Sequence, residues 1–77
     1  MDIKDFLANF AEQFEETEKS FFTPQVEFKS LNEWDSLIAM AIIGMSDASY
    51  NVKLTGDDIR NSKTIEDLFE IINNRIQ

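Results

Sequence analysis

The stretch from Leu37 to Met45 constrains the fold most, because every position in it except Gly44 is apolar. Asp35 stands just before it, and an aspartate carboxylate can accept hydrogen bonds from the unpaired amides of a first helical turn. The pattern therefore predicts a helix from Ser36 to about Tyr50. A helix that is apolar on all sides is either fully buried or offers one face to a partner. In a chain of 77 residues few other elements can cover it, so we expect one exposed face.

A helical wheel divides this predicted helix into two sides. The side that we expect to face the core contains Ala39, Ile42, Ile43, Ser46 and Tyr50. The side that we expect at the surface near Ser36 contains Leu37, Ile38, Met40, Ala41 and Met45. Apolar area left in water costs about 25 cal/mol per Å², which favours covering by a partner. We therefore predict a docking face made of Trp34, Ile38, Met40, Ala41 and Met45, unless the preceding loop folds over part of it.

Amphipathic helices are also predicted near both ends of the chain. Apolar residues recur at spacings of three and four after a possible capping box of Asp2 and Asp5, which predicts a first helix from Ile3 to about Glu16. A last helix is predicted after the capping residue Thr64, on the apolar positions Ile65, Leu68, Phe69, Ile72 and Ile76.

The segments between these helices differ in character. Residues 19–34 show no sustained period, and Pro24 forbids a long helix there, yet the segment is rich in aromatic residues. We expect a long loop that its aromatic side chains pin across the core, with room for a helical turn. Thr55 with Asp58 predicts a short capped helix around Ile59. The whole chain, residues 1–77, is thus predicted as one all-α domain, a small bundle of three main helices and a short one.

The composition excludes several classes of function. The chain has no cysteine, so it has no disulfide and no thiolate metal site, and it has no histidine, the usual general base and the commonest transition-metal ligand. Adjacent acids on a helix point about 100° apart and do not converge on one substrate atom. We therefore expect no catalytic residue, no metal site and no enzymatic activity of its own.

The formal charge is −8, from fifteen acidic and seven basic residues. Such a surface repels nucleic acid and anionic membranes and attracts basic partner proteins, although acidity can also serve solubility alone. No apolar run reaches the roughly 20 residues of a membrane span, and the start of the chain is amphipathic rather than signal-like. We expect a cytoplasmic monomer that does not bind nucleic acid.

Ser36 is the one side chain that the sequence marks for chemistry. It falls at the first position of the predicted helix, where its hydroxyl can point into solvent beside the positive end of the helix dipole. It lacks a histidine or a suitably placed lysine as its base, so it cannot activate itself as a nucleophile. It is suited to accept a group that another enzyme transfers.

Asp35-Ser36-Leu37 at the start of a second helix resembles the motif of the acyl carrier protein family. The acidic charge, the length, the long loop before the serine and the short helix around Ile59 are also similar, so the resemblance covers nearly the whole chain. It implies that a phosphopantetheinyl transferase attaches 4'-phosphopantetheine from coenzyme A to Ser36. The thiol of that group would hold an acyl chain as a thioester for acyl-loading and acyl-processing enzymes. By the same resemblance, Asp35 helps to place the serine and Leu37 packs beside the prosthetic arm.

The chain departs from the family at two places. Glu33 stands where the family often has glycine, two residues before the aspartate, and the predicted second helix has Asp47 as its clear acid where the family usually has several. These differences favour partners in a specialised pathway over the ordinary enzymes of fatty-acid synthesis, although fatty-acid or polyketide-type synthesis stays open as the setting. Two alternatives stay open: an aminoacyl carrier protein, or an unmodified acidic helical module for protein interaction.

Overall fold

Each of the four α-helices begins at a residue whose side chain accepts a backbone amide. In the computed structural model, which describes residues 1–76, the helices are α1 (Ile3–Ala11), α2 (Ser36–Tyr50), α3 (Gly56–Asn61) and α4 (Ile65–Arg75). Their caps are Asp2, Asp35, Thr55 and Thr64. The last two form complete capping boxes with Asp58 and Asp67, as the sequence predicts. At α1 the Asp2 side chain accepts the Lys4 amide at 3.0 Å, and the capping box predicted with Asp5 does not form.

The first helix is shorter than the sequence predicts. It ends at Ala11 and continues as turns to Phe14, where we expected helix to Glu16. In a longer helix the amides of residues 15–17 would bond to carbonyls four residues earlier. Here all three donate instead to the carboxylate of Glu33. A side chain from a distant part of the chain therefore binds the amides that would have extended this helix.

The long connection between α1 and α2 is held against the helices at several points. It contains two single-turn 3₁₀ helices, η1 (Lys19–Phe21) and η2 (Phe28–Ser30). Phe22 and Phe28 are buried, which confirms the pinned loop, but Phe21 is 59% exposed. Polar bonds add to this packing, since the carbonyl oxygens of Pro24 and Val26 accept the Glu66 and Ile65 amides at the start of α4.

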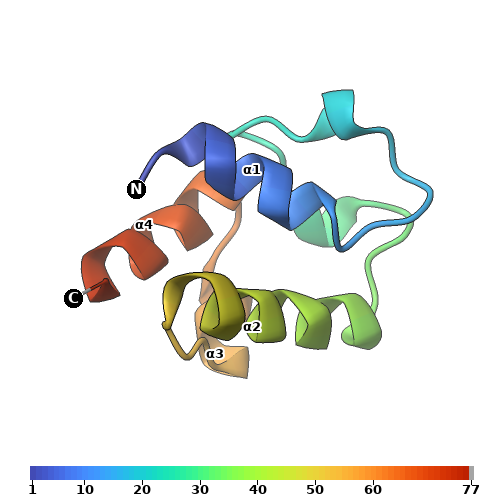
Figure 1. Cartoon of the computed structure of the whole chain (residues 1–77). Helices are drawn as coiled ribbons and strands as arrows, with labels where there is room; N and C mark the ends of the chain where they lie inside the picture. The colour runs from blue at the N-terminus through green and yellow to red at the C-terminus, as the bar shows by residue number, and fades with distance from the viewer. Residues whose placement is uncertain (77) are drawn as a thin grey trace.

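The core joins aromatic side chains of α1 and the long loop to aliphatic side chains of α2 and α4. Phe6 and Phe10 of α1 are fully buried, and the Phe10 ring lies 5.5 Å from Phe28 and 5.6 Å from Phe14. Aliphatic side chains of α2 and α4 complete the core, the fully buried ones being Ile42, Ile65, Leu68 and Ile72. Figure 1 shows α1 above α2, with α4 beside α1 and the start of α1 and the end of α4 on the same side of the domain.

The buried face of α2 is rotated relative to the predicted one. Ile42, Met45 and Ser46 are its buried residues, a stripe at spacings of three and four. Met45 is only 8% exposed, so its predicted place on the surface is wrong. Because α2 is apolar nearly all round, its sequence does not fix which way it turns about its axis. Ser46 also secures the end of the helix, since its hydroxyl donates to the Val52 carbonyl at 2.8 Å.

The domain is all-α, with three main helices and shorter helical turns, and residues 1–76 contain no strand. Within that range no helix has both the length and the apolar character needed to cross a membrane.

Candidate functional site

Residues 33–36 form the corner that leads into α2. The side chains of Glu33, Trp34 and Asp35, the three residues before Ser36, hold this corner in place. Asp35 caps α2, with its Oδ1 atom 2.8 Å from the Ile38 amide, as its place before the apolar stretch predicts. Ser36 is the first residue of the helix and is exposed. The hydroxyl-bearing residue thus stands in solvent at a defined helix start.

Trp34 anchors the corner through its ring. The indole lies 5.0 Å from the Phe28 ring in an edge-to-face arrangement and 6.4 Å from the Phe14 ring in a stacked one. It is half-buried and packs against the core. We predicted Trp34 as part of a docking face, but its ring packs against Phe14 and Phe28, so it also holds the loop to the turn that follows α1.

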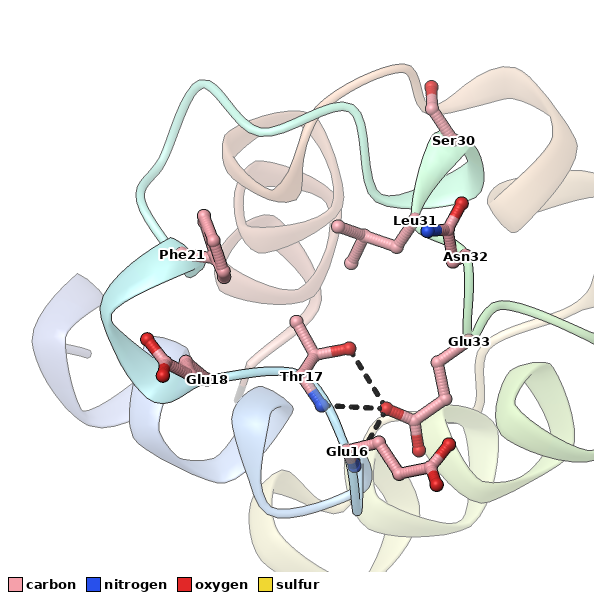
Figure 2. A pocket seen from close by; sticks show the side chains of 8 residues that line it. All are labelled: Glu16, Thr17, Glu18, Phe21, Ser30, Leu31, Asn32 and Glu33. Carbon is pink, nitrogen blue, oxygen red and sulfur yellow. Dashed lines mark hydrogen bonds between the residues drawn. The ribbon is translucent and has the colours of Figure 1, made fainter.

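Glu33 makes the densest polar contact of the region (Figure 2). Its Oε2 accepts the Glu15 amide at 2.6 Å, and its Oε1 accepts the Glu16 and Thr17 amides, both at 3.0 Å, and the Thr17 hydroxyl at 2.9 Å. The hydrogen bond from the Glu15 amide is the main cause that lowers the pKa of the Glu33 carboxyl below its ordinary value. Desolvation raises that pKa in part, and the other three hydrogen bonds lower it further. Successive amides that converge on one anion form a nest.

An apolar groove of about 440 Å³ opens directly beside Ser36. Trp34, Ala39 and Ile43 line its α2 side, and Ile59 lines its α3 side. Two cations, Lys29 and Arg60, stand at the same groove. Lys29 also ties the loop to α3, since its Nζ donates to the Ile59 and Arg60 carbonyls at 3.1 and 2.9 Å. Sequence reasoning missed this groove, because its two walls come from separate helices.

A larger cleft of about 700 Å³ lies in the long loop, away from the Ser36 hydroxyl. Figure 2 shows Phe21 and Leu31 facing each other across it, with Thr17 and Glu33 at its base. The lining includes three carboxylates and no cation. Only the smaller groove includes Ser36, so chemistry at the serine concerns that groove.

The predicted docking face is only partly exposed. Met40 is 68% exposed, and the neighbouring Leu37 is 74% exposed. Ile38 and Ala41 are half-buried, and Ile38 packs against the core. With Met45 in the core and Trp34 in the loop packing, the exposed apolar patch consists chiefly of Leu37, next to Ser36, and Met40, one turn further along the helix.

Among the described residues no group of three or more His, Cys, Asp or Glu side chains could hold a metal ion. Comparisons with protein-family models, with curated proteins and with solved structures found no match to this chain. The residues around Ser36 are therefore the features from which its function is inferred.

Proposed function

We propose that the chain is an acyl carrier protein that carries 4'-phosphopantetheine on Ser36. The observation that supports this most is the place of the Ser36 hydroxyl: exposed at the first residue of α2, behind a capping Asp35, and beside an apolar groove. A modifying enzyme can reach such a serine, and the groove offers apolar surface next to it. The all-α architecture with a long first loop fits a bundle of the acyl-carrier-protein type.

The attachment is a phosphoryl-group transfer. The Ser36 oxygen attacks the phosphorus of coenzyme A that bears the pantetheine arm, and a new P–O bond forms. The pyrophosphate P–O bond breaks, adenosine 3',5'-bisphosphate leaves, and the hydroxyl proton passes to a base of the transferase. The chain supplies no base, in keeping with its lack of histidine and with its proposed role as a substrate rather than an enzyme.

The residues near Ser36 fit the group. A phosphodiester at the first residue of α2 is favoured by the helix dipole, by about 0.3–1 kcal/mol, although the Asp35 carboxylate opposes it. Lys29 and Arg60 line the same groove and bring positive charge to it. Leu37 and the apolar groove residues offer contacts to an arm or its cargo. When bound, the group supplies a thiol that holds an acyl chain as a thioester.

The proposed partners are a phosphopantetheinyl transferase and the enzymes that load and process the acyl chain. The exposed start of α2 presents Leu37 and Met40 with no acid among residues 36–46, so contact there depends more on apolar area than on salt bridges. This supports a dedicated set of partners in a specialised pathway. An aminoacyl cargo would use the same Ser36 chemistry.

Intact-mass measurement tests the proposal. The protein is incubated with coenzyme A, magnesium and a broad-specificity transferase, and we expect a gain of one phosphopantetheine. Ser36→Ala should abolish the gain and keep the helical circular dichroism. Ser49→Ala, an exposed serine on the same helix, is the matched control and should be modified like the wild type. An unmodified wild type, or a modified Ser36→Ala protein, would contradict the proposal and favour an unmodified interaction module.

A further inference from the structure

The Glu33 carboxylate joins two segments that are distant in sequence and meet before Ser36. It accepts four hydrogen bonds, from the Glu15, Glu16 and Thr17 amides and from the Thr17 hydroxyl. Figure 2 shows the bonds from Glu16 and Thr17. These donors lie just after α1, and Glu33 lies three residues before Ser36. The contact thus ties the start of α2 to the end of α1.

The bonds require a carboxylate in particular. Both oxygens are used as acceptors, Oε2 by the Glu15 amide and Oε1 by the other three donors. A glutamine at this position has a single acceptor oxygen, and its NH₂ group would face a donor. An alanine would leave the donors without a protein partner. A hydrogen bond to an ionised acceptor is stronger than a neutral one, so the charge also matters.

The three residues before Ser36 act on the same short corner in different ways. Trp34 fixes it by ring packing against Phe14 and Phe28, and Asp35 fixes it by capping α2. Ring packing is non-directional, so it holds the corner against the core without specifying its orientation. The Glu33 bonds add direction, because their donors are amides of the backbone that follows α1.

We propose that Glu33 is a positioning residue, which fixes the Trp34–Ser36 corner so that the Ser36 hydroxyl is presented in one orientation for modification. The expected effect on the rate of Ser36 modification rests on the proposed function. The expected effect on the rigidity of residues 34–36 does not. A rate that depends on the alignment of the attacking oxygen is sensitive to small displacements.

The test compares Glu33→Gln and Glu33→Ala with a control at the start of another helix. Asp67→Asn is that control, since its carboxylate also accepts two backbone amides, from Lys63 and Thr64, both at 3.0 Å, but caps α4. We would measure ¹⁵N order parameters and relaxation dispersion at residues 34–36, and transferase kcat and KM with coenzyme A, at a temperature where every variant is folded.

We expect the order parameters at the corner to fall from about 0.85, the rigid range, in the order wild type, Gln, Ala, or exchange broadening to appear there. The value of kcat should fall by about tenfold in Glu33→Ala with KM little changed, because the exposed α2 surface is intact. Asp67→Asn should leave both readouts at their wild-type values.

Each other outcome has a definite meaning. A corner that stays rigid in Glu33→Ala overturns the positioning role, even if kcat falls, because Glu33 would then act by touching the transferase. A mobile corner with an unchanged kcat overturns it for modification. Absence of modification in the wild type contradicts the proposed function, and the relaxation data then decide separately whether Glu33 fixes the corner.

Discussion

Arg75 and Asp58 form a two-pronged ion pair between the last turn of α4 and the first turn of α3. Nη1 of Arg75 lies 2.7 Å from Oδ2 of Asp58, and Nη2 lies 2.8 Å from Oδ1. The same carboxylate accepts the Thr55 amide at 2.9 Å. The Asp58 side chain is only 14% exposed, so solvent screens the pair less than an open surface pair. This contact joins α3 and α4, two helices that are consecutive in sequence.

The ion pair predicts a stability contribution that disappears in acid. The Arg75 hydrogen bonds, followed by those from Thr55, lower the pKa of Asp58 to about 2. A group whose folded-state pKa is lowered stabilises the fold above its unfolded pKa and stops doing so as the pH falls through the folded value. We expect Asp58→Asn to reduce the free energy of unfolding by roughly 1–2 kcal/mol near pH 7 and by much less near pH 2, measured by urea denaturation.

Asp57→Asn is the matched control for this prediction. Asp57 sits on the same helix and pairs with Arg60, but both side chains are exposed. Its replacement should change the free energy of unfolding by less than about 0.5 kcal/mol at either pH. A loss for Asp58→Asn that stayed equal across the pH range would show that the pairing is not electrostatic in origin.

The net charge predicts that salt stabilises the folded protein. The described residues form four ion pairs, whereas the chain has fifteen acidic side chains, so much of the charge of −8 is unbalanced locally. Salt screens such repulsion over roughly 10 Å at 0.1 M. The melting temperature near neutral pH should rise on adding sodium chloride or low-millimolar divalent cations. A fall would mean that the four pairs outweigh the repulsion.

The local part of the structure could be predicted from the sequence. Asp35, Thr55 and Thr64 are followed by helices that begin where their caps require, because a cap is decided within a few residues of chain. The bounds of α2 follow from Asp35 at one end and from Asn51 at the other, whose left-handed backbone (φ 57°) ends the helix. Ser36 therefore lies where the sequence predicts.

The long-range part could not be predicted in this way. The amides that follow α1 bond to Glu33, which is 16–18 residues away, and no local sequence pattern indicates that pairing. The wall of the groove at Ile59 depends on how α3 lies beside α2. The burial of Met45 depends on how α2 turns about its axis, which an apolar helix leaves undetermined.

Gly44 predicts an easy gain in stability. It lies inside α2, it is exposed, and a Cβ atom added there would meet nothing within 4 Å. Glycine within a helix is less favourable than alanine by about 0.5–1 kcal/mol, chiefly through backbone entropy. Gly44→Ala should therefore raise the free energy of unfolding by about that amount. Gly56→Ala is the comparison, and its gain should be smaller, because Gly56 opens α3 and its added Cβ would lie 3.4 Å from Arg60.

Met40 and Met45 make the sharpest test of which side of α2 is free to meet a partner. Met40 is 68% exposed and Met45 is 8% exposed, although the sequence places them on the same side of the helix. Met40→Glu should change the free energy of unfolding by less than about 0.5 kcal/mol, the usual range for surface positions. Met45→Glu loses core packing and carries a charge into the interior, so it should cost several kcal/mol, roughly 3 or more. Urea denaturation of the two variants measures the difference.

The same Met40→Glu variant then tests whether the exposed patch is used. If Leu37 and Met40 meet the transferase, the KM for modification of Ser36 should rise in Met40→Glu, because a charge is placed in an apolar contact. Asp47→Asn, a change of charge at an exposed position two turns further along α2, should have a smaller effect. An unchanged KM in Met40→Glu would mean that the patch stays in solvent during that encounter. A large loss of stability in the same variant would show that Met40 packs inside the folded domain, which would contradict its exposed position.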